Sequence, residues 1–419
     1  MAGRPLICCP QCATVHQRVA IKPGALAACQ RCLHVLYRQS AVGLDGWIAL
    51  TIAALIVFGI ANAFPIATLS IQGSTVQASL PGALWLTWQQ GNWVLAIMTG
   101  LAGFWMPLTQ LLFLLWGLLS IRSGRLPADF GIGMRFLYRL APWSMVPVLM
   151  LGLLVAIVKF SGFAPLEPEP GLWGFAALTV LLTILSRFSA HRLWRYAEDA
   201  ALVPVSGEMV NLQRPAAACS ACGYVQNQSP SSSPKSCQRC GAHIRFRKPD
   251  TSSRVWALIL AASIVYIPAN VLPVMQVRTA TGVSLHTIVG GVVELWHMGS
   301  WDLAIIVFVA SVVVPMTKLL VLAALQINHR WRGPIIQRQR TRLYEAVEFI
   351  GQWSMLDVFV VLLMTALADF PGISQIVAGP GAASFGMVVV LTMLAAFSYD
   401  PRQGWDQDPT ALCVKEFND

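Results

Sequence analysis

The chain has 419 residues, of which 56% are hydrophobic and only 11% are charged. Because soluble domains usually carry about a quarter charged residues, this composition excludes an ordinary water-soluble fold and indicates an integral membrane protein. The formal net charge of +10 is typical of cytoplasmic loops that face anionic lipid, so we expect no nucleic-acid binding.

Eight apolar runs are long enough to cross a hydrocarbon core of about 30 Å as helices of about 20 residues. The first twelve residues contain no apolar core of the length that a signal peptide needs, so we expect the N-terminus to be retained. The predicted spans lie near residues 45–70, 93–121, 136–160, 171–190, 254–275, 301–327, 346–369 and 379–398.

The distribution of Lys and Arg predicts the orientation of these spans. Positive residues gather before the first span, between the second and third, and between the sixth and seventh, whereas residues 66–92 carry no charge. Because short loops rich in Lys and Arg stay in the cytoplasm, we expect both termini and the segment 196–253 to be cytoplasmic.

The chain also contains an internal duplication, in which the same signals recur about 208 to 210 residues later. The paired motifs are NAFP (62–65) with NVLP (270–273), MPLTQLL (106–112) with VPMTKLL (314–320), and WSM at Trp143 with WSM at Trp353. An even number of helices in each half makes the repeats parallel in the membrane. After the first span of each half, period-two alternation predicts a periplasmic β-hairpin, near 69–80 and 277–285.

Two cysteine clusters carry the spacing of metal ligands. Each has two Cys-x2-Cys pairs, and the clusters comprise Cys9, Cys12, Cys29 and Cys32, then Cys219, Cys222, Cys237 and Cys240. In a reducing cytoplasm four such thiolates favour one tetrahedral metal over disulfides. We predict two structural zinc ribbons, because a closed four-thiolate shell leaves no open position for catalysis; iron in a rubredoxin-like site is the alternative.

Two further cysteines, Cys8 and Cys413, have no ligand spacing of their own, and the Cys-x2-Cys pattern favours Cys9 over its neighbour Cys8. A redox role, in which these pairs exchange disulfides, is the competing interpretation. It lacks the βαβ pattern that surrounds such motifs.

Ionisable residues within the spans mark a second candidate site, since a charge in the hydrocarbon region is costly. Lys318 and Asp357 lie about ten residues from the cytoplasmic ends of their predicted helices, or roughly 15 Å deep at 1.5 Å per residue. We expect them to form a polar transport site with Thr317, Ser354 and Thr392. Snorkelling of Lys318 to the headgroups is the alternative. The first half has Gln110 and Pro147 at the positions of Lys318 and Asp357.

These features resemble the paraquat-inducible protein A (PqiA/LetA) family over nearly the whole chain. The resemblance rests on the two cysteine ribbons and on PANVLP (268–273), VPMTKLL (314–320), GQWSMLDVF (351–359) and SYDPRQGWD (398–406). The expected architecture is all-α and polytopic, with eight transmembrane helices in two duplicated four-helix halves. The predicted units are a zinc ribbon (1–42), a transmembrane domain (43–195), a second ribbon with linkers (196–253), a second transmembrane domain (254–400) and a tail (401–419).

The resemblance implies a bacterial inner-membrane subunit that passes phospholipid between the membrane and a periplasmic MCE-domain tunnel protein. The sequence has no phosphate-binding loop of an ATPase and no constellation of residues that indicates an enzyme, while its intramembrane titratable groups could use a proton gradient. A small-solute or drug carrier and a membrane redox protein remain the alternative functions.

Overall fold

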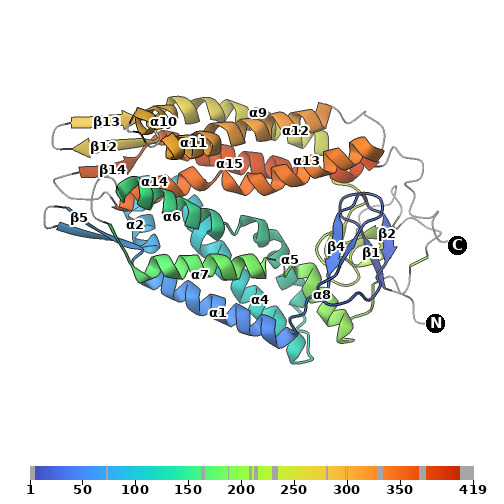
Figure 1. Ribbon diagram of the computed structural model, residues 1–419. Helices are drawn as coiled ribbons and strands as arrows, with labels where there is room; N and C mark the ends of the chain where they lie inside the picture. The colour runs from blue at the N-terminus through green and yellow to red at the C-terminus, as the bar shows by residue number, and fades with distance from the viewer. Residues whose placement is uncertain are drawn as a thin grey trace.

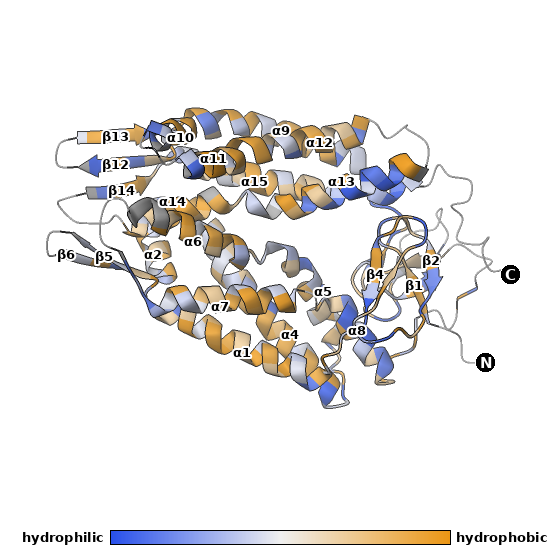
Figure 2. Ribbon diagram, viewed as in Figure 1, coloured by the Kyte–Doolittle hydropathy of each residue, from blue (hydrophilic) through white to orange (hydrophobic). Residues whose placement is uncertain are grey.

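The computed structural model describes the chain except residues 1–4, 72–73, 162–165, 187, 207–209, 212–215, 229–234, 280–281, 298, 300, 328–333, 368–373 and 406–419, and except the side chains of some helical residues, Asp357 among them. The two halves form one elongated helical body, with β-strands at one end and the two cysteine ribbons at the other (Figure 1). Figure 2 shows mainly hydrophobic residues along α1, α7 and α9, and many hydrophilic ones in α8 and α13.

The two halves repeat the same order of elements as far as their last apolar helix, α7 in the first and α15 in the second. The first half contains α1 (Leu44–Ala63), β5 (Ala67–Ile71), β6 (Ser74–Ala78), α2 (Leu80–Gln89), α3 (Trp93–Gly100), α4 (Met106–Arg122), α5 (Phe130–Leu140), α6 (Val146–Ser161), β7 (Leu166–Pro168), α7 (Pro170–Leu185) and α8 (Ala190–Asp199). The second contains α9 (Thr251–Val271), β12 (Met275–Thr279), β13 (Gly282–His286), α10 (Ile288–His297), α11 (Trp301–Phe308), α12 (Val314–Ile327), α13 (Pro334–Trp353), α14 (Leu356–Leu367), β14 (Ser374–Ala378) and α15 (Pro380–Ser398).

Within the described parts of the chain, six helical segments are long and apolar enough to cross a membrane: Leu44–Ala63, Trp93–Arg122, Phe130–Ile157, Thr251–Val271, Ala304–Ile327 and Pro380–Trp405. A seventh results if α7 and α8, which bend by 54° at their junction, are counted as one span. The predicted span at 346–369 is broken after Trp353, and α14 has 12 residues, about 18 Å of helix. Of the eight predicted spans, six or seven therefore correspond to helical segments in the described residues that are long and apolar enough to cross a membrane.

Both predicted hairpins are confirmed, and each gains a third strand that the sequence did not reveal. β5 pairs antiparallel with β6 and with β7, so that Ala67 lies opposite both Ala78 and Pro168. β12 pairs in the same way with β13 and β14. Each sheet thereby ties the loop after the first span of a half to the loop before its last span.

A π-helical turn precedes a proline at the same place in both halves. The π-helices η1 (Leu101–Trp105) and η3 (Val309–Val313) stand before Pro107 and Pro315, and they keep the flanking helices continuous. A proline cannot donate the usual backbone hydrogen bond, and a π-turn absorbs that defect.

Glycines allow the closest helix contacts. α7 packs along α1, where a Cβ on Gly174 would lie 2.9 Å from the Ala61 Cα. The two halves meet where α14 packs on α6, and a Cβ on Gly152 would lie 3.2 Å from the Phe359 Cβ. Small residues at such crossings let helix backbones approach closely in membranes. α14 therefore belongs to the second half in sequence but contacts the first half extensively.

The ribbons are built from short antiparallel hairpins. The first ribbon contains β1 (Leu6–Cys8), β2 (Val15–Gln17), β3 (Leu26–Ala28) and β4 (Val35–Arg38). The second contains β8 (Ala216–Ala218), β9 (Val225–Asn227), β10 (Lys235–Ser236) and β11 (His243–Ile244). The two ribbons pack on each other through Leu6 and Val15 from the first and Ala216 and Val225 from the second.

Candidate functional site

Each Cys-x2-Cys pair forms a tight turn closed by backbone hydrogen bonds. In the first turn the Ala13 amide donates to the Cys9 carbonyl at 2.9 Å, and Ala13 has a φ of 61°. Leu33 occupies the same left-handed position in the second turn of this ribbon, and Gly223 and Gly241 occupy it in the other ribbon. This repeated turn aims both sulfurs of a pair towards one point.

The eight predicted cysteines come together as two buried groups, and within each group the ligand atoms all lie within 4.8 Å of one another. The Sγ–Sγ distances are 3.4 Å for Cys9–Cys32, 3.5 Å for Cys12–Cys29, 3.6 Å for Cys219–Cys240 and 3.5 Å for Cys222–Cys237. Disulfide sulfurs would be about 2.05 Å apart. A tetrahedron with zinc–sulfur bonds of about 2.3 Å has edges of roughly 3.8 Å, so the donor set fits a metal ion of this kind.

The close approach of four thiol groups in each cluster also favours binding of a cation. Hydrogen bonds from neighbouring thiols, together with burial, raise the pKa of the Cys9 and Cys222 thiols, whereas such hydrogen bonds lower the pKa of Cys29 and Cys237. Four thiolates cannot share so small a volume without a compensating metal, which is why binding releases protons and stabilises the fold. The Cys8 Sγ contacts the Ala13 carbonyl oxygen at 3.3 Å and lies outside the cluster.

The second candidate site lies in the interior of the second half. The Lys318 side chain is only 1% exposed. Its Nζ donates to the Thr392 Oγ1 at 2.9 Å and to the Gly351 carbonyl oxygen at 3.3 Å. The ammonium group therefore points into the contact between α12, α13 and α15, which argues against the snorkelling alternative.

The other predicted members of this site have different surroundings. The Ser354 Oγ is buried and has no hydrogen-bond partner among the described residues. Thr317 is exposed on the surface of α12 and does not share the environment of Lys318. Asp357 is in α14, close in sequence to Ser354, but its side chain is outside the described part of the structure. The ion pair between Lys318 and Asp357 thus stays a prediction.

The first half places a neutral amide at the corresponding position. The Gln110 Oε1 is buried and has no hydrogen-bond partner in the part of the chain that the structure describes. The helical framework, with its π-turn and proline, is common to both halves, while the buried cation belongs to the second half.

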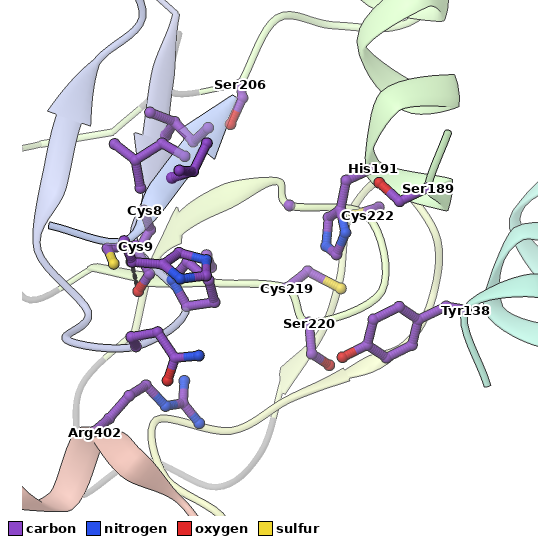
Figure 3. A pocket seen from close by; sticks show the side chains of 18 of the residues that line it. Cys8, Cys9, Tyr138, Ser189, His191, Ser206, Cys219, Ser220, Cys222 and Arg402 are labelled. Atoms are coloured by element: carbon purple, nitrogen blue, oxygen red, sulfur yellow. Dashed lines mark hydrogen bonds between the residues drawn. The ribbon is translucent and has the colours of Figure 1, made fainter. Parts of the chain in front are cut away.

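A pocket of about 440 Å³ lies where the two ribbons meet the ends of the two halves. Figure 3 shows Tyr138, Ser189 and His191 facing Cys219 and Cys222 of the second ribbon, with Cys8 and Cys9 of the first ribbon opposite. No motif predicted this pocket, because its walls come from segments that are far apart in the chain.

Charged side chains at the pocket wall form hydrogen bonds and ion pairs with other groups of the protein. The Arg402 Nε lies 2.8 Å from the Asp400 Oδ1, and the Lys248 Nζ donates to the Phe397 and Tyr399 carbonyl oxygens at 2.7 Å. Burial lowers the pKa of Lys248, while the nearby Asp400 opposes that shift. These contacts cap the end of α15 and fix the second ribbon's linker to it.

The duplicated helical framework is also found when the chain is compared with known protein families. The sequence profile of the paraquat-inducible protein A family matches residues 44–198 and 252–408. The chain belongs to this family. The match occurs twice, once in each half, and the two matched segments contain the helical domains without the ribbon clusters.

Curated relatives match over nearly the full length. The chain is 28% identical to the intermembrane transport protein PqiA of Escherichia coli K12, covering 96% of each chain. It is 28% identical to the lipophilic envelope-spanning tunnel protein A of the same strain, covering 95% of this chain and 90% of that one. A probable intermembrane transport protein of Haemophilus influenzae is 29% identical over 95% of each. No solved structure matches the chain significantly.

We predict close to two metal ions per chain in protein purified without chelators. Replacing both Cys219→Ser and Cys222→Ser should lower this to one and destabilise the second ribbon, because the folding free energy of such ribbons depends on the metal. Elemental analysis measures the content. The Cys8→Ser variant is the matched control and should keep both ions, whereas wild-type protein with almost no metal would contradict the assignment.

Proposed function

We propose that this protein is the inner-membrane subunit of an intermembrane lipid transport system, passing phospholipid between the membrane and a periplasmic MCE-domain tunnel protein. The observation that carries the proposal is the full-length similarity to relatives named for intermembrane transport and for a lipophilic envelope-spanning tunnel. The membrane-spanning helices and the duplicated family match support it. The protein acts as a transporter and not as an enzyme.

In this proposal the eight spans include the short α7 and α14, and each half contributes four. The units are the ribbons 1–42 and 196–253, the helical domains 43–195 and 254–400, and the tail 401–419. The ribbons and both termini face the cytoplasm, and the two three-stranded sheets face the periplasm. Support comes from the positive-inside distribution of charge and from the location of the ribbons and sheets at opposite ends of the helical body (Figure 1).

Each ribbon holds one structural zinc ion through its four cysteines. The closed set of buried sulfurs leaves no position for a substrate. The same burial disfavours the redox alternative, since a thiol that exchanges disulfides must be accessible.

The polar site around Lys318 is the proposed coupling site. A buried ammonium in the hydrocarbon region requires internal partners, and Thr392 and Gly351 supply two of them. Ser354 and Asp357 complete the site, while Thr317, which is exposed on the surface of α12, lies outside it. A carboxyl group that is protonated and deprotonated beside an ammonium alternates between paired and released states, which links a proton gradient to two conformations.

The orientation is tested by a cysteine introduced at Val283, an exposed residue of β13. A membrane-impermeant thiol reagent added to the periplasmic side should label it, because β13 belongs to a periplasmic sheet. A cysteine at the exposed Lys22 in the first ribbon is the matched position and should be protected until the membrane is opened. The reverse pattern of labelling would overturn the topology.

The coupling site is tested by Lys318→Met and Asp357→Asn in a lipid-transfer assay with vesicles that contain the purified protein and its periplasmic partner. Each change should lower lipid transfer at least about tenfold, because a charged side chain within a membrane-spanning helix is costly and usually serves the function of the protein. Membrane insertion should stay near normal. The first-half changes Gln110→Met and Pro147→Ala are the controls and should have much smaller effects. Full transfer by both second-half variants would contradict the site.

A further inference from the structure

The two ribbons share a feature that metal binding does not require. The second cysteine pair of each ribbon has the sequence CQRC, at Cys29–Cys32 and at Cys237–Cys240. The arginines of these turns, Arg31 and Arg239, therefore occupy equivalent positions between two metal ligands.

The first arginine packs on a tryptophan from the far end of the chain. The Arg31 guanidinium carbon lies 4.9 Å from the ring centroid of Trp405, and its Nη2 donates to the Trp405 carbonyl oxygen at 3.2 Å. Trp405 is only 1% exposed and belongs to the same buried cluster as the four cysteines of the first ribbon. Its indole Nε1 donates to the Thr341 Oγ1 of α13 at 3.3 Å. The tryptophan thus lies between the first ribbon and α13.

The second arginine makes the equivalent contact in the first half. The Arg239 guanidinium carbon lies 4.9 Å from the ring centroid of Tyr224 in its own ribbon and 5.4 Å from that of Trp194 in α8, and Arg239 forms an ion pair with Glu198 of α8. Trp194 and Trp405 each follow the last apolar helix of a half. The duplication therefore conserved one arrangement, an arginine between two cysteines that packs on the tryptophan after a fourth helix.

Each CQRC turn contacts the half of the protein that does not directly follow it in the sequence. Only five residues separate the first ribbon from α1 of the first half, since β4 ends at Arg38 and α1 begins at Leu44. Nevertheless its CQRC turn docks on the second half. The CQRC turn of the second ribbon docks on the first half, where a Cβ on Gly131 of α5 would lie 3.2 Å from the Cys240 carbonyl oxygen.

The first ribbon also binds α13 directly. The Arg338 Nε donates to the Arg31 carbonyl oxygen at 2.8 Å, and the His34 Nδ1 lies 2.7 Å from the Glu345 Oε1. Arg338 and Glu345 are two helical turns apart, so they lie on one face of α13. Two side chains on this face and the stacked Trp405 therefore attach the helix to the ribbon.

The same helix reaches the buried cation. The Gly351 carbonyl oxygen near the end of α13 accepts the hydrogen bond from the Lys318 Nζ. Glu345 and Gly351 are six residues apart, about 9 Å along the helix. A continuous α-helix thus connects the metal-binding turn of the first ribbon to the polar site of the second half.

We propose that the first ribbon is a clamp that positions α13, and that Arg31 and Trp405 are its positioning residues for the polar site around Lys318. The proposal rests on the proposed function for the role of that site, but its geometry stands independently. The clamp of Arg239 on Trp194 holds the first half, where Gln110 replaces the cation, and so it does not act on Lys318.

The test compares Arg31→Met with Arg239→Met in the full-length protein in lipid vesicles. Amide hydrogen exchange of the α13 segment 338–351 reports the local stability of this helix. We expect exchange there to rise about tenfold in Arg31→Met and to stay at the wild-type level in Arg239→Met, whose exchange should instead rise in α8. Arg31→Lys keeps the cation and should restore much of the protection.

The metal content of Arg31→Met, together with a second variant, separates the loss of the clamp from the loss of a metal ion. Arg31→Met should retain two metal ions, because the arginine is not a ligand. If it loses one, Trp405→Leu decides the question, since this change leaves the ribbon sequence intact and should raise exchange in α13 to the same extent. Unchanged exchange of α13 in Trp405→Leu, or an equal rise in Arg239→Met, would overturn the clamp.

Lipid transfer separates the clamp from the proposed function. Where the wild-type protein transfers lipid, Arg31→Met should transfer much less than Arg239→Met. Increased exchange of α13 with full transfer would overturn the control of the polar site by the ribbon. A wild-type protein that transfers no lipid would instead contradict the proposed function, while the exchange measurements would still test the clamp.

Discussion

A buried ammonium in the membrane-spanning part of the second half constrains much of the surrounding structure. A charge in hydrocarbon is costly unless the protein supplies its partners, and Lys318 takes its partners from Gly351 of α13 and Thr392 of α15. Three helices must therefore keep a fixed relation to one another. The buried hydroxyl of Ser354 adds a polar group that is unsatisfied among the described residues, so the site has capacity for a further polar partner.

Duplication supplied one framework, which the two halves use differently. Both halves retain the three-stranded sheet, the π-turn before a proline and the arginine that packs on a tryptophan. The buried cation is present in the second half, and Gln110 stands in its place in the first. The same framework, with Gln110 and Pro147 in the first half at the positions of Lys318 and Asp357, gives a scaffold in one half and a candidate coupling site in the other. The close contact of Gly152 with Phe359 joins the two through α14.

The sequence predicted features that depend on local spacing. All eight cysteine ligand positions, both hairpins and six of the spans follow from periodicities within short segments. It did not predict β7 and β14, because each pairs with a strand about 100 residues earlier. It also missed the break after Trp353, since the apolar run continues across it. The docking of each CQRC turn on the half that does not follow it depends on contacts such as Arg31 with Trp405, which lie far apart in the sequence.

The most direct measurement of the central claim is purification of the protein from native membranes, followed by protein identification and lipid analysis of the complex. The account predicts that an MCE-domain protein and phospholipid are recovered together with the chain, and that both are retained after mild detergent washing. Recovery of the chain without a periplasmic MCE partner, with a water-soluble small molecule in place of phospholipid, would contradict it and favour a small-solute carrier.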